Sequence, residues 1–312
     1  MQTILGAGGA IGIELAKALP QHTDRIRLVS RHPEAVNPDD ELFPADLTVP
    51  EQVDQAVMGS KVVYLTVGLP YDIKVWRRVW PTLMRNVLDA CIRHGSKLVF
   101  FDNIYMYDRE HLQHMTEETP MRPTSKKGLI REEIAKMLLK ETAAGKLDAL
   151  IARSADFIAP TNSILVEMVY KNLLAGKKAD WMADASKVHT FTYAPDAAQA
   201  TALLGNSPEA YGQVWHLPTD PARLTGAQWV DLIASEMGVE PRYRILPVWL
   251  MGVIGVFVPI IRELKEMAYQ YDRDYFFDSG KFDRQFKLPA TPAKEAVRQT
   301  VAHLQQEAAT AE

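Results

Sequence analysis

The sequence has few of the residues that mark disulfide-rich, metal-binding or nucleic-acid-binding proteins. Its 312 residues include one cysteine, Cys91, which excludes an intramolecular disulfide and a cysteine-cluster metal site. The eight histidines lack metal-ligand spacing, such as two histidines four residues apart beside a carboxylate, so we expect no metal. The net charge of −4 offers no basic patch, and we do not expect nucleic acid as a partner.

The sequence also lacks an apolar run long enough to span a membrane. The longest candidate, residues 245–261, carries no charge before Arg262, but a span needs roughly 20 apolar residues. Pro247 and Pro259 interrupt it, so we expect a buried or partly exposed helix, with a membrane-surface helix as the less favoured alternative. Because a strand is expected almost at the first residue, we expect no signal peptide and predict a cytoplasmic protein.

A glycine-rich stretch at residues 1–12, MQTILGAGGAIG, is the most informative part of the sequence. Residues 3–5 predict a strand, glycines follow at once, and residues 13–19 continue with helical spacing. Such glycines let the backbone turn tightly and approach phosphates, while the helix start presents free N–H groups and a positive dipole end. The stretch therefore predicts a dinucleotide pyrophosphate site. We expect its contacts to come from Gly6, Gly8, Gly9, Ala10, Ile11 and Gly12.

The alternation of short apolar runs and helical stretches up to about residue 160 predicts a doubly wound parallel sheet of Rossmann type, in the α/β class. The expected strands are residues 3–5, 25–30, 41–46, 61–67, 97–102 and 147–153. We predict a dinucleotide-binding domain over residues 1–160. Residues 161–312 are predicted to form a smaller α/β substrate lobe, some elements of which return to the Rossmann core.

The end of the second expected strand bears on which dinucleotide binds. A carboxylate there would accept hydrogen bonds from the adenosine ribose and select NAD. The sequence instead has Ser30 and Arg31, which favour the 2′-phosphate of NADP(H) and leave NAD(H) as the alternative. The remaining cofactor contacts expected at strand ends are Asp46 and Leu47 near the adenine, and Val67 and Gly68 near the second ribose and nicotinamide.

Four further stretches, together with the glycine turn, give the chain a family resemblance over nearly its full length. They are residues 45–47, 99–107, 151–160 and 278–282. The chain resembles the extended short-chain dehydrogenase/reductase family of NAD(P)-dependent epimerases and dehydratases. The resemblance implies a NAD(P)-dependent oxidoreductase or epimerase/dehydratase, acting on a small carbonyl or sugar-like substrate.

The chain departs from that family at its catalytic groups, a Tyr-x-x-x-Lys pair and a serine or threonine. None of the eleven tyrosines is followed four residues later by lysine. Aligned without gaps, Thr124 takes the place of the tyrosine, Gly128 that of the lysine and Asn103 that of the serine. A threonine hydroxyl has too high a pKa to replace an activated phenol, so the chain resembles an atypical member.

Three interpretations of this departure stay open. In the first, the catalytic groups have migrated: Tyr105 or Tyr107 supplies the phenol, Lys126 or Lys127 the cation, and Asn103 a hydrogen bond to a carbonyl. In the second, hydride transfer proceeds without a strong protein acid. In the third, the protein binds NADP(H) without turnover and acts as a sensor or regulator.

Other expected contacts involve substrate and a second copy of the chain. Lys126 and Lys127 fall in the first turn of a helix, where they oppose the dipole unless an anion lies nearby, so we also expect phosphate or ribose contacts there. Asp156, after the sixth strand, is the predicted substrate-binding residue. Family resemblance further implies a homodimer through the helices near residues 73–94 and 126–144.

Overall fold

The computed structural model describes residues 1–311, which form two compact units that interleave along the chain. The first unit comprises residues 1–106, 123–154 and 197–217. The second comprises residues 107–122, 155–196 and those from 218 onward. The boundary predicted at residue 160 divides the chain by function, into a cofactor domain and a substrate lobe. That functional division stays a prediction.

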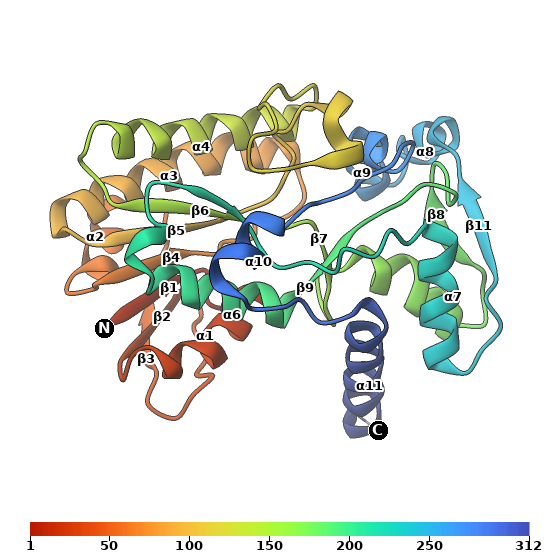
Figure 1. The fold of residues 1–312 in the computed structure, drawn as a ribbon, viewed down its shortest axis with the longest axis horizontal. Helices are drawn as coiled ribbons and strands as arrows, with labels where there is room; N and C mark the ends of the chain where they lie inside the picture. The colour runs from red at the N-terminus through yellow and green to blue at the C-terminus, as the bar shows by residue number, and fades with distance from the viewer. Residues whose placement is uncertain (312) are drawn as a thin grey trace. The chain divides into compact units, whose positions relative to one another are not determined.

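A seven-stranded parallel sheet forms the centre of the first unit, in the order β10-β6-β5-β4-β1-β2-β3 (Figure 1). The strands are β1 (Gln2–Leu5), β2 (Ile26–Ser30), β3 (Glu41–Pro44), β4 (Val62–Leu65), β5 (Lys97–Asp102), β6 (Ala149–Arg153) and β10 (Val214–His216). Every residue of β1, β4 and β6 is buried, as expected for strands covered on both faces, whereas the edge strand β3 alternates between half-buried and exposed residues. The predicted Rossmann-type α/β fold is confirmed.

Helices cover both faces of this sheet (Figure 1). One face carries α2 (Pro50–Val57), α3 (Ile73–His94) and α4 (Lys126–Ala143), and the other carries α1 (Ala10–Ala18) and most of α6 (Ala194–Gly205). The strand order reverses between β1 and β4, and in such sheets ligands bind at the carboxyl ends of the strands beside this switch point. The fold thus places the glycine turn after β1 at the expected ligand edge.

The apolar residues of α3 and α4 bear on the expected dimer. Leu83 and Val87 on α3, and Ile130, Ile134 and Leu138 on α4, are all buried. They are therefore used in packing within the chain. The homodimer stays a prediction.

The second unit contains two small parallel sheets, β7 (Asp156–Ile158) with β9 (Phe191–Tyr193) and β8 (Ala179–Met182) with β11 (Tyr243–Leu246). Its helices are α5 (Lys171–Leu174), α7 (Gly226–Met237), α8 (Val248–Ile254), α9 (Pro259–Met267), α10 (Gly280–Phe286) and α11 (Ala293–Ala311). A π-helical turn, Val166–Tyr170, precedes α5. The core includes the buried side chains of Trp181 and Trp229.

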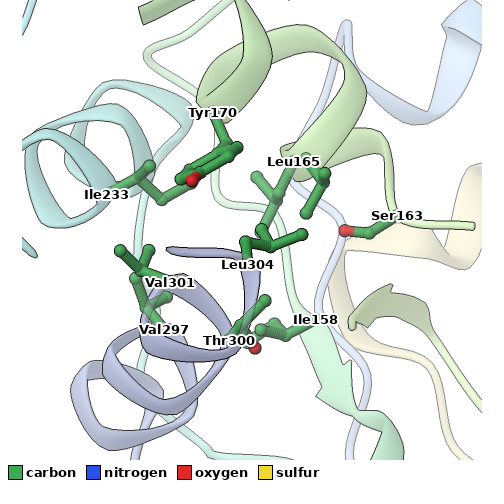
Figure 2. Close-up of a pocket in the computed structure, with 10 residues that line it drawn as sticks. Ile158, Ser163, Leu165, Tyr170, Ile233, Val297, Thr300, Val301 and Leu304 are labelled. Atoms are coloured by element: carbon green, nitrogen blue, oxygen red, sulfur yellow. The ribbon is translucent and has the colours of Figure 1, made fainter. Parts of the chain in front are cut away.

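Figure 2 shows a small cavity in the core of the second unit, with a volume of about 20 Å³. Apolar side chains line most of it, including Ile158, Ile233 and Val301. Two of the three hydroxyls in its wall are bonded to backbone, Ser163 Oγ to Phe157 O at 2.7 Å and Thr300 Oγ1 to Ala296 O at 2.8 Å, and the third belongs to Tyr170. A void of this size holds about one water molecule. It is a packing defect, too small for a sugar or a nucleotide.

The apolar run at residues 245–261 forms two helices instead of the single helix expected. α8 ends at Ile254, and α9 begins five residues later with Pro259 at its first position. The run is only partly buried, since Trp249 and Phe257 are exposed. Within residues 1–311, no helix combines the length and apolarity needed to cross a membrane.

Candidate functional site

The glycine turn between β1 and α1 is built so that two of its glycines admit no side chain. Gly6 has a φ of +100°, and a Cβ there would lie 2.7 Å from the backbone of Val67. A Cβ on Gly12 would lie 2.6 Å from the carbonyl oxygen of Gly6, so the first turn of α1 packs directly on the turn. These contacts hold β1, the turn and α1 in one fixed arrangement.

The outer part of the turn is open. Gly8 is exposed, and a Cβ added there would meet nothing within 4 Å. Gly9 is the N-cap of α1, with no side-chain cap and no acidic residue in the first turn. The first-turn N–H groups, which include those of Ala10, Ile11 and Gly12, therefore lack a side-chain acceptor, as a phosphate-binding helix start requires. These residues fit a dinucleotide pyrophosphate.

At the end of β2, Ser30 is half-buried and Arg31 is exposed. The Asp46 carboxylate, beyond β3, accepts hydrogen bonds from Thr48 N at 2.9 Å and Thr48 Oγ1 at 2.7 Å. These bonds, and then the positive charge of Arg31, lower the pKa of Asp46 below its ordinary value. The Asp46 carboxylate therefore lies within electrostatic range of Arg31, whose positive charge is expected to bind a 2′-phosphate. Leu47 is buried, and its carbonyl accepts from Asn86 Nδ2 at 3.0 Å.

The end of β4 lies directly against the glycine turn. Thr66 Oγ1 donates to the carbonyl oxygens of Leu5 at 3.3 Å and Gly6 at 3.4 Å. Val67 is half-buried beside Gly6, and Gly68 is exposed with open space at its Cβ position. The structure therefore brings Val67 and Gly68 to the turn, on the edge where the sequence predicts cofactor contacts.

The end of β5 positions Asn103. Its backbone N–H donates to Asp102 Oδ1 at 2.9 Å, and its side-chain Oδ1 accepts from Tyr105 N at 3.0 Å. Asp102 is itself buried between two ion-paired arginines, Arg131 and Arg153. Since the Asn103 carbonyl oxygen is used locally, the amide NH₂ is the group available as a hydrogen-bond donor to a ligand.

Lys126 and Lys127, at the start of α4, lie in different environments. Lys126 is exposed, but Lys127 is fully buried with its Nζ 4.5 Å from the ring centre of Tyr71. Ser125, the N-cap, accepts from Gly128 N at 3.0 Å, while Thr124 is exposed before the helix. A lysine could not take the place of Gly128, because a Cβ there would overlap the Tyr105 carbonyl oxygen.

Tyr71, the ring that Lys127 contacts, belongs to a cluster of aromatic side chains. Trp76 lies edge-on to Tyr71, with ring centres 5.8 Å apart, and stacks on Tyr105 at 6.3 Å and 15° between planes. Tyr107, the other phenol predicted from the sequence, belongs to the second unit, is 1% exposed and pairs with Met121. The structure thus brings Lys127 together with Tyr71, a residue that the sequence analysis missed. The only sequence signal for Tyr71 is its place in the loop after a core strand.

In the second unit, Asp156 belongs to a polar cluster, called the Asp156 cluster below, in which a histidine ring stacks between two tyrosine rings. Its Oδ2 lies 3.0 Å from His189 Nε2 and accepts from the Tyr271 hydroxyl at 2.8 Å. The His189 ring stacks between Tyr271 at 4.2 Å and Tyr275 at 4.3 Å. His189 is 2% exposed, and its Nδ1 has no hydrogen-bond partner. No sequence signal pointed to His189 or Tyr271 as partners of Asp156.

Among residues 1–311 there is no group of three or more histidine, cysteine, aspartate or glutamate side chains placed to hold an ion. The Asp156 cluster contributes one carboxylate and one imidazole, with a phenol as its third member.

Comparison with known proteins gives structural neighbours of low sequence identity. A dTDP-glucose 4,6-dehydratase from Streptomyces venezuelae, with NAD bound, has a TM-score of 0.79 and 15% identity, covering 99% of this chain and 98% of its own. A UDP-glucose 4-epimerase from Thermus thermophilus, in complex with NAD, has a TM-score of 0.78 and 18% identity, covering 98% and 99%. A UDP-N-acetylglucosamine 4-epimerase from Bacillus cereus has a TM-score of 0.77 and 15% identity, covering 97% and 99%.

At these identities the neighbours establish the fold. No curated protein matches the sequence. The family described as NAD dependent epimerase/dehydratase matches residues 3–216, which include the glycine turn and all seven strands of the sheet apart from Gln2, the first residue of β1. The chain therefore belongs to the NAD-dependent epimerase/dehydratase family.

Proposed function

We propose that the protein is a NAD(P)-dependent oxidoreductase or epimerase/dehydratase with non-standard acid–base groups, acting on a sugar-like or small carbonyl substrate. The observation that carries the proposal is the glycine turn, in which Gly6 and Gly12 leave no room for side chains at the switch point of the sheet. Family membership supports the reaction class. The names of the neighbours, which include a dTDP-glucose dehydratase and two UDP-sugar epimerases, support a sugar-like substrate.

We favour NADP(H) as the cofactor, with NAD(H) as the alternative. Ser30 and Arg31 support NADP(H), because no acidic residue closes β2. The Asp46 carboxylate, whose negative charge lies within electrostatic range of Arg31, and the two neighbours with bound NAD support the alternative. Arg31→Asp tests the choice: we expect the ratio of NADPH to NADH affinity to fall at least about tenfold. An unchanged ratio in titration calorimetry would refute a phosphate role for Arg31.

A bound nicotinamide would supply hydride acceptance and donation, and the chain must supply proton transfer. We propose that the Tyr71 phenol, held beside the Lys127 ammonium, takes this part. The Lys127 Nζ lies 4.5 Å from the centre of the Tyr71 ring, and a cation beside a phenol favours the ionised form that a general base needs. The Asn103 amide is the proposed donor to the substrate oxygen. Tyr105 is the alternative phenol, because it joins the same cluster through Trp76.

Asp156 is the proposed substrate contact in the second unit. Its Oδ2 takes both hydrogen bonds from His189 and Tyr271. We propose that Oδ1 accepts from a substrate hydroxyl, since the two bonds fix the carboxylate in one orientation. Such a polar acceptor suits a sugar better than an apolar carbonyl compound.

The second candidate function is a NADP(H)-binding sensor without turnover. The observations that favour it are the exposed Thr124 at the place of the family's tyrosine and the tightly packed Gly128 at that of its lysine. Both candidates need the glycine turn. They differ only in chemistry.

The test combines dinucleotide titration with a substrate screen. The purified protein is titrated with NADH and NADPH, then screened with UDP-sugars, dTDP-sugars and small carbonyl compounds by nicotinamide absorbance and by NMR detection of epimers. Tyr71→Phe keeps the ring beside Lys127, so we expect dinucleotide affinity within about twofold and turnover reduced at least about 100-fold. Tyr243→Phe, at an exposed position on β11, is the matched control and should leave both unchanged.

Three outcomes would change the proposal. Turnover retained in Tyr71→Phe but lost in Tyr105→Phe would assign the phenol to Tyr105. Turnover retained in both would favour hydride transfer without a strong protein acid. Tight dinucleotide binding with no turnover on any substrate class would favour the sensor.

A further inference from the structure

The segment formed by α8, the following turn and the start of α9, residues 248–260, displays apolar side chains to solvent. We call it the apolar hairpin. Phe257 is 83% exposed, Val256 72% and Trp249 70%, and Val253 and Ile260 are also exposed. These side chains come from a helix, a turn and a second helix that follow one another in the chain. Exposed apolar surface of this kind marks a contact with a partner or a membrane.

Two glycines explain how the hairpin holds together without burying these side chains. A Cβ on Gly255 would lie 2.9 Å from Cα of Arg262, and one on Gly252 would lie 2.8 Å from Nζ of Lys265. α9 therefore packs on a side of α8 that has no side chains. Met251 is the fully buried anchor of α8. The exposed residues are not needed to join the two helices, and they are left facing outward.

The charges beside the hairpin have one sign where they are exposed. Residues 247–262 contain no acidic residue. Arg262 and Lys265 on α9 are exposed, whereas Glu263 between them is buried and Glu266 is half-buried. Aromatic side chains at an apolar surface, with long cationic side chains beside it, are typical of helices that lie in the interface of a bilayer with anionic lipids.

We propose that the apolar hairpin is a peripheral membrane anchor that inserts Trp249 and Phe257 into the interface of an anionic lipid bilayer. A fluid interface accepts side chains that project in several directions, whereas a second copy must offer a matching apolar hollow. An open depression of about 510 Å³ in this unit mixes charged side chains, Asp220, Asp231 and Lys294, with apolar ones, so it is not a matching apolar hollow. The charge of the exposed cations also favours lipid phosphates over a second cationic hairpin. The proposal is independent of the catalytic one, since it uses none of the same residues.

The test measures binding to vesicles by flotation. The full-length protein is mixed with vesicles of phosphatidylcholine alone, or of phosphatidylcholine and phosphatidylglycerol in equal amounts. We expect flotation with the anionic vesicles, and a blue shift in the tryptophan emission that is absent from Trp249→Phe. The double variant Trp249→Ser/Phe257→Ser should lower the partition coefficient at least about tenfold. Arg262→Gln/Lys265→Gln should lower it less, and added salt should have the same effect.

Leu174→Ser is the matched control, because Leu174 is a 64% exposed apolar residue of α5 outside the hairpin. It should bind vesicles as the unmodified protein does. Circular dichroism and the thermal midpoint show that each variant is folded. Equal losses of vesicle binding in the control and in the hairpin variant would overturn the proposal in favour of nonspecific hydrophobic adsorption. No vesicle binding, together with a dimer in light scattering that Trp249→Ser/Phe257→Ser dissociates, would overturn it in favour of self-association.

Discussion

The glycine turn of the first unit and the Asp156 cluster of the second are both polar sites, but they are assembled in different ways. The turn uses backbone groups within residues 6–12, braced by the end of the neighbouring strand β4. The cluster uses side chains that are 33 and 115 residues apart in sequence. A site made of backbone needs glycine at fixed positions and is visible in sequence. A site made of distant side chains leaves no local pattern.

We therefore predict that the glycine turn is disrupted by substitutions that add a side chain, and the Asp156 cluster by substitutions that remove one. The turn fails when a side chain occupies its close contacts. The cluster fails when an acceptor is lost and buried donors are left without a partner.

Gly6→Ala is expected to have the largest effect. Its Cβ would lie 2.7 Å from the Val67 backbone in a φ of +100° that side chains rarely adopt. We expect the free energy of unfolding to fall by about 2 to 4 kcal/mol and dinucleotide binding to be lost. Gly8→Ala is the control, since its Cβ meets nothing within 4 Å. It should leave the urea midpoint unchanged and weaken only dinucleotide binding. Equal urea midpoints for the two variants would show that the close contacts do not matter.

Asp156→Ala is expected to have an intermediate effect. It removes the acceptor of His189 Nε2 and of the Tyr271 hydroxyl, and we expect unfolding free energy to fall by about 2 to 3 kcal/mol. Tyr271→Phe removes one donor and keeps the stacked ring, so it should cost about 1 kcal/mol. A loss below about 0.5 kcal/mol for Asp156→Ala in urea unfolding would show that the cluster does not stabilise its unit.

Val301→Ile is expected to have the smallest effect, and of the opposite sign. The added methylene can enter the cavity of about 20 Å³ shown in Figure 2, so we expect a gain of about 0.5 to 1 kcal/mol. Val63→Ile, at a fully buried position on the central strand β4, is the matched control and should be destabilising. Thermal unfolding measures both. Destabilisation by Val301→Ile would mean that the cavity wall cannot accept the longer side chain.

The sequence predicted the sheet well because its signals are local. The strands β1, β4 and β6 are buried on both faces, and each contains an apolar run (residues 4–5, 62–65 and 149–152) bounded by glycine or polar residues. It predicted less of the second unit. The strands β7 and β8 have three and four residues, too few for a periodic pattern to appear. The exposure of Trp249 and Phe257 agrees with the partly exposed form of the helix expected there, and Gly252 and Gly255 let α9 approach α8 closely.

The proposed catalytic residues also differ in whether the sequence could identify them. Asn103 was identified because ungapped alignment places it where the family has its serine, directly after the core strand β5, and the strand fixes its position. The partner of Lys127 was not, because Tyr71 lies 56 residues earlier and meets it only when α4 packs beside the loop after β4. Ungapped alignment places Thr124 and Gly128 where the family has its tyrosine and lysine. It could not show that the packing of Gly128 against Tyr105 leaves no room for a lysine at that position.

The sequence by itself determined the parallel sheet and the glycine turn, since burial and a positive φ restrict which residue types can stand at each position. It also determined that the family's Tyr-x-x-x-Lys pair is missing. Only the tertiary structure decided which phenol faces the buried Lys127, which groups hold Asp156, and which side of the α8–α9 pair faces solvent. Some of those contacts join segments that are distant in the chain, and others depend on how two helices pack. Their free energy depends on the whole fold rather than on any local pattern.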